Sequence, residues 1–194
     1  MCIFFYDYLE GGKMKIQLIG ASGTGKSTLA RYIAEKEQIK WIDTDHYLWK
    51  DETFSEKHPI EQRLKMYEYD RNEFDQFVVS GSVFSWNPAG FTDRDLLVFL
   101  TLDDEQRFER LIKREIARGG TTSLWLNEQG DQTNDFLEWC KTYYTAKSSS
   151  DIGTFAEHKY QIAQSKSPVL KLDSNQSLEI LYREIIKYLQ RNPL

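Results

Sequence analysis

The chain alternates short apolar runs with longer segments in which apolar residues recur every three or four positions. Five runs have the length of a buried strand, and they fall at 16–19, 40–43, 77–84, 96–100 and 168–172. The segments between them have the spacing of helices, as in Leu178, Leu181, Ile185 and Leu189 near the C-terminus. Short strands that alternate with helices predict a parallel sheet with right-handed crossovers.

The first apolar run leads directly into a glycine-rich loop. Residues 20–27 are GASGTGKS, which fits the pattern G-x-x-x-x-G-K-[ST] in full, and a helical segment follows from Thr28. A strand, a glycine-rich loop and a helix in this order indicate a phosphate-binding P-loop. The glycines let backbone N–H groups approach a phosphate chain, and the helix N-terminus adds partial positive charge.

This loop predicts a site for ATP and Mg²⁺. Lys26 is a point charge for the outer phosphates, and Ser27 offers a hydroxyl to the metal. The residues expected to bind the nucleotide are Gly20, Ser22, Gly23, Thr24, Gly25, Lys26, Ser27 and Thr28. With a P-loop after the first of five strands, we expect a three-layer α/β/α fold of the P-loop nucleoside triphosphate hydrolase type. The expected strand order is 2-3-1-4-5.

Two carboxylates, Asp43 and Asp45, follow the second apolar run. Open α/β sheets hold their sites at the carboxyl ends of the strands, and two residues this far apart share one face of an extended chain. One can serve Mg²⁺ or its water, and the other can accept a proton from a substrate hydroxyl. We assign Asp43 to the metal and Asp45 to catalysis, with a role in the Mg²⁺ water shell as the alternative for Asp45. A polar turn that only caps a helix is the third interpretation.

The third apolar run ends without the acid that many P-loop proteins carry there, because Ser80 occupies that position. Any acid that the site needs must therefore come from the Asp43–Asp45 pair.

A basic stripe follows the fourth apolar run. Arg107, Arg110 and Arg114 have the spacing i, i+3, i+7 and would line one side of a helix whose apolar side is Phe108, Leu111, Ile112 and Ile116. The stripe is either a cationic clamp on transferred phosphoryl oxygens or a solvated face paired with neighbouring glutamates. The segment after it has hinge-like glycines and no clear strand, and we expect a helical lid at about 115–166.

Composition narrows the function classes. A chain of 194 residues with 40% hydrophobic residues can form one domain with a proper core. Its two cysteines cannot form a disulfide framework, which favours a reducing cytoplasm, and the net charge of −5 argues against a general nucleic-acid surface. No apolar run approaches the roughly 20 residues of a membrane helix.

Residues 1–13 have no place in this pattern. They are expected to be either a non-native extension before a start at Met14 or a packed N-terminal extension. The predicted catalytic domain is 14–194.

The motifs together resemble the small P-loop kinases of the adenylate and shikimate kinase fold. Within these, the chain is most similar to the adenylate-kinase-like DNA topology modulation (FlaR-related) proteins, through the P-loop, Asp45–Trp49, Val79–Val83 and Arg107–Arg114, although Ser80 departs from their pattern. The resemblance implies that residues 23–28 bind ATP, that Arg110 and Arg114 clamp phosphates, and that residues 173–177 border the adenine.

These features favour an ATP- and Mg²⁺-dependent phosphotransferase that acts on a small molecule, with a nucleoside or nucleotide among the candidate acceptors. The alternative is a regulatory P-loop ATPase with little kinase activity, which the serine at position 80 favours.

Overall fold

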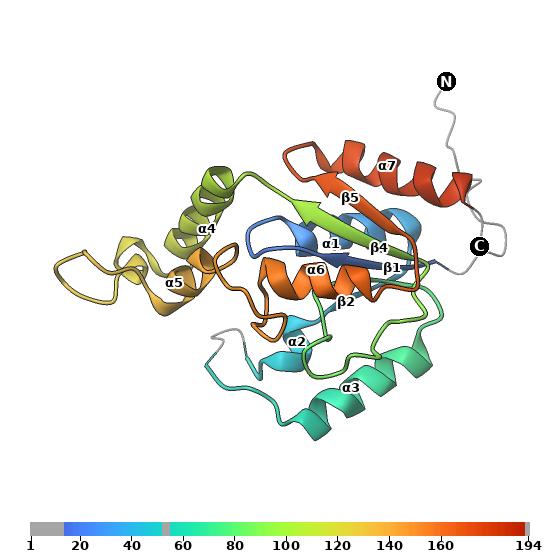
Figure 1. Cartoon of the computed structure of the whole chain (residues 1–194), viewed down its shortest axis with the longest axis horizontal. Helices are drawn as coiled ribbons and strands as arrows, with labels where there is room; N and C mark the ends of the chain where they lie inside the picture. The colour runs from blue at the N-terminus through green and yellow to red at the C-terminus, as the bar shows by residue number, and fades with distance from the viewer. Residues whose placement is uncertain (1–13, 52–54, 193–194) are drawn as a thin grey trace.

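The computed structural model describes residues 14–51 and 55–192 and contains one five-stranded parallel sheet (Figure 1). The strands are β1 (Lys15–Ile19), β2 (Lys40–Asp43), β3 (Phe77–Ser80), β4 (Leu96–Thr101) and β5 (Val169–Asp173). Their order is β2-β3-β1-β4-β5, which confirms the predicted topology. The expectation for residues 1–13 lies outside the described residues.

The helices connect these strands. They are α1 (Lys26–Glu37), α2 (Asp45–Leu48), α3 (Ile60–Glu73), α4 (Asp104–Gly119), the 3₁₀ helix η1 (Thr121–Leu124), α5 (Asp135–Lys141), α6 (Phe155–Ala163) and α7 (Leu178–Arg191). None of the helices in the described part of the chain combines the length and the apolar content needed to cross a membrane.

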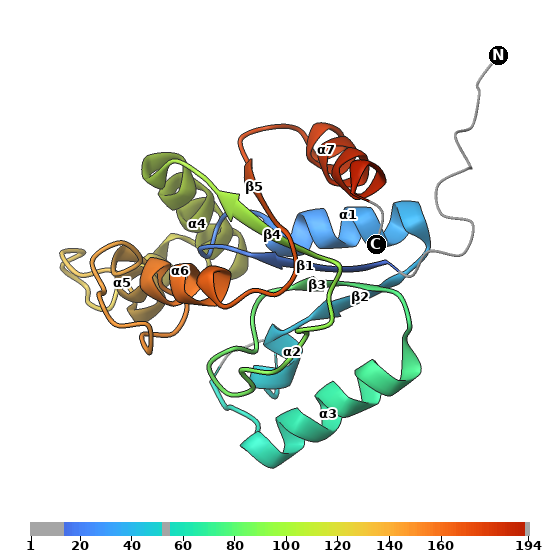
Figure 2. The ribbon, with the colours of Figure 1, turned by 45° about the vertical axis from the view of Figure 1, so that its right-hand side comes forward.

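Both faces of the sheet are covered, which produces the three layers. On one face, Ile16 and Leu18 of β1 pack with Ile33 of α1 and Ile185 of α7 in a buried cluster. On the other face lie α3 and α6 (Figures 1 and 2). The three central strands β1, β3 and β4 can be buried on both sides because their sequences are mostly apolar, whereas the edge strands β2 and β5 are partly exposed.

The P-loop lies at the centre of the sheet edge. It follows β1, whose neighbours are β3 on one side and β4 on the other. The strand order reverses at this central strand, and open α/β sheets bind ligands at such a switch point. The topology alone therefore places the loop where ligands are expected.

Two helices have few buried residues, and the apolar side predicted for α4 was partly wrong. No residue of α3 is buried, and Ile60 is 55% exposed. In α4 the buried residues are Leu111 and Arg107, whereas Ile112 and Ile116 are exposed. The physical reason for α4 is its position: it extends beyond the end of β4 (Figure 1), so it buries Leu111 against Leu137 and Cys140 of α5 and not against the sheet.

The structure also divides the segment predicted as a lid. Phe155 and Ile162 of α6 pack against the sheet residues Ile19, Leu97 and Phe99. This part of the range 115–166 packs on the core layer, because Phe155 and Ile162 lie seven positions apart on one helix face that meets the sheet. Residues 120–141, with η1 and α5, lie next to α4 and beyond the sheet (Figure 1).

The burial pattern predicts unequal costs for two isoleucine truncations. Ile33→Ala should lower the free energy of unfolding by about 2–5 kcal/mol, because it leaves a cavity where the side chain is 0% exposed. The control Ile60→Ala, at a position 55% exposed, should change it by about 0.5 kcal/mol or less. Urea unfolding measures both, and equal effects would contradict the described core.

Candidate functional site

A cavity of about 560 Å³ opens where the P-loop, the ends of β2 and β3, and α4 meet. It brings together residues that lie far apart in the sequence. The predicted site residues that line it are Ser22, Gly23, Thr24, Gly25, Lys26, Ser27, Thr28, Asp43, Asp45, Arg110 and Arg114. The exception among the predicted residues is Gly20, which does not line the cavity.

Gly20 serves the packing of the loop instead. It has a φ of +147°, and a Cβ there would lie 2.3 Å from the carbonyl oxygen of Leu100 in β4. Gly23 has a φ of +88° and lies against α4, where a Cβ would meet the carbonyl oxygen of Arg107 at 3.0 Å. Only glycine allows both the backbone angles and these approaches. The loop is therefore held tightly between β4 and α4.

The N-terminus of α1 faces this cavity with free donors. The residue that precedes the helix is Gly25, which has no side chain to cap the first N–H groups. The first turn contains no acidic residue. The first N–H groups of a helix have no partner within the helix, so these remain available to an anion.

Lys26 lies at the base of the loop. Its Nζ donates a hydrogen bond to the carbonyl oxygen of Ala21 at 3.0 Å. Burial lowers the pKa of Lys26 to about 8, although the nearby Asp45 and Asp43 oppose the shift. A phosphate group at this point would favour the charged ammonium.

The two carboxylates face the same cavity, but not from one extended strand. Asp43 ends β2, Thr44 has helical backbone angles, and Asp45 begins α2. The backbone N–H of Asp45 donates to Oδ1 of Asp43 at 3.2 Å. The surrounding protein atoms shield the Asp45 carboxyl from water and so raise its pKa, and the negative charge of Asp43 raises it further. Asp45 is thus a carboxyl with a raised pKa whose charge interacts with that of Lys26.

Ser80 supports the end of β2. It pairs with Asp43 in the parallel register of β2 and β3, and its Oγ accepts a hydrogen bond from Nε1 of Trp41 at 3.0 Å. Its carbonyl oxygen accepts the backbone N–H of Thr44 at 3.1 Å. The sequence pattern indicated that an acid is missing here, but it gave no sign of the role of Trp41, because the contact joins two strands.

The basic stripe splits into two parts. Arg110 and Arg114 line the cavity, and Nη2 of Arg110 donates to the carbonyl oxygen of Ser174 at 3.2 Å. The guanidinium of Arg114 lies over the ring of Phe136, 5.0 Å from its centroid. Arg107 is 1% exposed and does not line the cavity, so the prediction of one continuous clamp was wrong for this residue. The interpretation as a solvated face fits Lys113, whose side chain is 77% exposed.

The loop after β5 closes the cavity on the far side of the P-loop. Ser174, Gln176 and Ser177 of this loop contribute to the lining. Ser177 also caps α7, since its Oγ accepts the backbone N–H of Ile180. The segment expected to border a base is thus part of the same cavity.

The cavity contains side-chain oxygen atoms that could bind Mg²⁺. The described residues contain no group of three or more His, Cys, Asp or Glu side chains that could hold a metal ion by themselves. The Ser27 hydroxyl and the Asp43 carboxylate line one cavity, and Mg²⁺ usually needs only one or two protein ligands because it keeps waters and binds substrate phosphates. The donor set fits Mg²⁺ bound together with a nucleotide.

Comparison with known sequences gives two extensive matches. A model of the AAA domain family matches residues 16–129. The uncharacterized protein YqaC of Bacillus subtilis (strain 168) is 33% identical over 180 residues, which covers 93% of this chain and 99% of that protein. A shorter match of 36 residues, 47% identical, links 19% of this chain to 21% of a shikimate kinase of Staphylococcus aureus (strain JH9).

Solved structures share the fold. The shikimate kinase from Bacteroides thetaiotaomicron aligns with a TM-score of 0.56 at 17% identity, covering 91% of this chain and 98% of that one. The shikimate kinase from Acinetobacter baumannii in complex with shikimate gives a TM-score of 0.53 at 16% identity, covering 94% and 96%. The chain belongs to the AAA domain family and has the fold of the P-loop kinases.

Proposed function

We propose that this protein is an ATP- and Mg²⁺-dependent phosphotransferase that phosphorylates a small molecule. The observation that carries the proposal is the single cavity in which a P-loop, two carboxylates and two arginines converge. Phosphoryl transfer requires little else from a protein, because its catalysis is mainly positioning and stabilisation of charge.

The P-loop end of the cavity is the proposed ATP site. The N–H groups of the P-loop and of the first turn of α1 would bind the phosphate chain, with Lys26 on the outer phosphates. Ser27 and Asp43 would hold Mg²⁺, directly or through water, and the metal would neutralise part of the phosphate charge. The loop at 173–177 would border the base.

Arg110 and Arg114 would act on the transferred phosphoryl group. Both extend from α4 into the cavity, and neither makes a close ion pair that an incoming phosphate would have to break: the nearest acid to Arg114 is Glu115, at 3.7 Å. Fixed cations of this kind stabilise the charge that develops in the transition state. We assign the lid of the 14–194 domain to residues 120–141, which continue from this helix.

Asp45 would serve the acceptor. Its raised pKa makes it a better proton acceptor than an ordinary aspartate, and it lies close enough to Lys26 for their charges to interact. A general base must be within reach of the hydroxyl that it deprotonates. A role in the Mg²⁺ water shell is the alternative for Asp45. Nucleosides and nucleotides are the first acceptors to test, since they are the acceptor class suggested by the adenylate-kinase-like resemblance.

The second candidate is a regulatory ATPase with little kinase activity. The observation that favours it is the absence of an acid at the end of β3, where Ser80 is held by Trp41. The two functions differ in one measurable property: the ATP turnover of a kinase rises when its acceptor is added.

An acceptor screen with a P-loop variant tests the proposal. ATP turnover by the wild type should rise with at least one nucleoside, nucleotide or small polyol. Lys26→Met should reduce this turnover to background, because it removes the positive charge that stabilises the transferred phosphoryl group. The circular dichroism spectrum should stay that of the wild type. Turnover that no acceptor raises would favour the ATPase, and wild-type activity in Lys26→Met would contradict the site.

The lowered pKa of Lys26 predicts pH-dependent nucleotide binding. Without ligand, the ammonium is charged below about pH 8 and loses its proton as the pH rises through that value. The affinity for ADP should therefore fall by roughly tenfold between pH 7 and pH 9, measured by calorimetry. Lys26→Gln should bind weakly with a flat profile, and the surface control Lys113→Gln should keep the wild-type slope. A flat wild-type profile would show that Lys26 does not contact the phosphates.

The two aspartates should differ in their effect on turnover. Asp45→Asn keeps the shape and removes the charge, and it should lower turnover on the order of 10²-fold, the scale of a lost general base. Asp43→Asn should be milder and should raise the Mg²⁺ concentration needed for half-maximal rate. If Asp45 instead organises the metal waters, the shift in Mg²⁺ requirement will appear in Asp45→Asn. An essential Asp43 with a dispensable Asp45 would reverse the assignment.

A further inference from the structure

Arg107 is a fully buried cation at the junction of three chain segments. Its side chain is 1% exposed, and arginine is rarely buried to this degree unless its charge and its donors have partners. It lies one turn before Arg110 on α4, yet it has no access to the cavity that Arg110 lines. Its partners therefore define its role.

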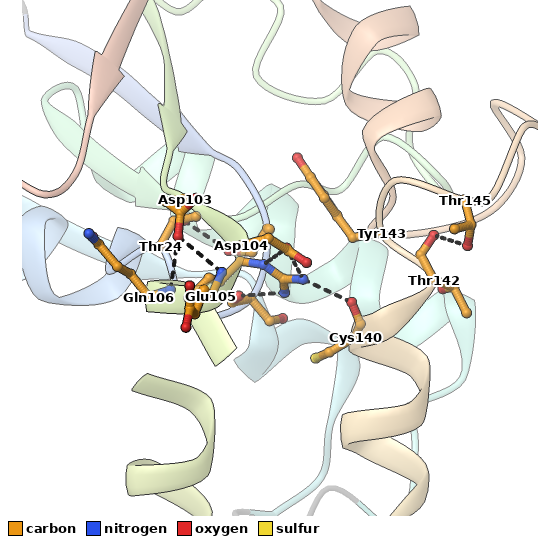
Figure 3. A network of polar contacts seen from close by, with 12 residues as sticks. Thr24, Asp103, Asp104, Glu105, Gln106, Cys140, Thr142, Tyr143 and Thr145 are labelled. Carbon is orange, nitrogen blue, oxygen red and sulfur yellow. Dashed lines mark hydrogen bonds and ion pairs between the residues drawn. The ribbon is translucent and has the colours of Figure 1, made fainter. Parts of the chain in front are cut away.

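The guanidinium donates to each segment at the junction. Nε and Nη2 donate to Oδ1 of Asp104 at 2.9 and 2.7 Å. Nη1 donates to the carbonyl oxygen of Ser22 in the P-loop at 3.2 Å, and Nη2 donates to the carbonyl oxygen of Cys140 in α5 at 3.1 Å. Asp104 and Cys140 appear as labelled partners in this polar network (Figure 3). A planar fork with several fixed donors suits such a junction, whereas a lysine cannot reproduce its geometry.

The P-loop and α4 also touch directly at this point. Gly23 lies so close to Arg107 that a Cβ would meet its carbonyl oxygen at 3.0 Å and its Cγ at 3.1 Å. A shift of the loop, such as a phosphate could cause, must therefore change the surroundings of Arg107.

From Arg107 the contacts continue to α6. The guanidinium lies 5.4 Å from the centroid of the Tyr143 ring, and the Tyr143 hydroxyl is hydrogen-bonded to Nδ1 of His158 at 3.1 Å. The backbone N–H of Phe155 donates to the carbonyl oxygen of Tyr143 at 2.9 Å. Because α6 packs on the sheet, the far end of the segment 120–141 is fixed between Arg107 and the core.

We propose that Arg107 is a positioning residue that couples the P-loop to the C-terminal end of the lid segment 120–141. When a nucleotide orders the loop at Ser22 and Gly23, Arg107 restrains Cys140 and Tyr143 and so holds the lid in its closed arrangement beside Arg110 and Arg114. The inference rests on the proposed nucleotide site, but it gives Arg107 no contact with the nucleotide. Coupling of this kind is reciprocal, so an ordered lid segment would in turn favour nucleotide binding.

Hydrogen–deuterium exchange with and without Mg·ADP tests the coupling. The proteins are the wild type, Arg107→Lys, and the control Arg118→Lys, which makes the same substitution on α4 at a side chain 51% exposed. In the wild type, ADP should slow exchange at 20–27 and also, by about fivefold, at 140–145. Arg107→Lys should keep the effect at 20–27 and lose it at 140–145, whereas Arg118→Lys should behave as the wild type.

The outcomes separate this inference from the proposed function. If ADP does not slow amide exchange at 20–27 in the wild type, the proposed nucleotide site is wrong, and the coupling is then wrong as well. If ADP protects 20–27 but not 140–145 in the wild type, or if Arg107→Lys keeps the protection at 140–145, only the coupling is overturned. A merely structural Arg107 would raise exchange with and without ADP equally and leave the ligand-induced difference unchanged.

A second variant covers the case in which Arg107→Lys does not fold. Asp104→Asn removes the charge that holds the Arg107 guanidinium. The Asp104 side chain is 51% exposed, so the substitution leaves the core intact. It should reduce the ADP-induced protection at 140–145 by about twofold or more. Wild-type protection in Asp104→Asn, with Arg107→Lys unfolded, would count against the coupling.

Discussion

The close packing of the P-loop between β4 and α4 is the constraint on which the site depends. Gly20 lies against the carbonyl oxygen of Leu100, and Gly23 lies against the backbone of Arg107, at distances that leave no room for a Cβ. A loop fixed on both sides keeps its N–H groups directed toward one region of space. The same packing fixes α4 relative to α1, and it thereby sets where Arg110 and Arg114 enter the cavity.

The charges in this cavity are incomplete without a ligand. Lys26 is half-buried and has a lowered pKa, while nearby protein atoms raise the pKa of the Asp45 carboxyl although its residue lies at the surface. Both groups are thus held in surroundings that disfavour their charged forms, which is common where titratable groups do chemistry. A nucleotide with its metal would supply negative charge beside the lysine and the arginines and positive charge beside the aspartates.

Local patterns predicted the parts of the fold that local sequence determines. The five strands and the P-loop followed from apolar runs and from one motif, because each depends on neighbours in the chain. The strand order followed from the fold type that this motif indicates. The division of the arginine stripe did not, since Arg107 is buried by Ser22 and Cys140, which lie 85 and 33 positions away. The lid predicted at about 115–166 shows the same limit of local sequence, because only the sheet beneath Phe155 and Ile162 shows that these residues pack on the core.

The serine at the end of β3 shows how the site can do without an acid on that strand. Among the described residues β2 is an edge strand with β3 as its one sheet neighbour, so the position of Asp43 depends on the contacts between these two strands. Ser80 supplies them: its Oγ accepts from Trp41, its carbonyl oxygen accepts from Thr44, and its register partner is Asp43. Arg31 lies over the Trp41 ring at 4.7 Å and secures the indole. The residue that replaces the acid thus holds the strand that carries Asp43 and leads into Asp45, and a larger acidic side chain at position 80 would have to displace the indole from this contact.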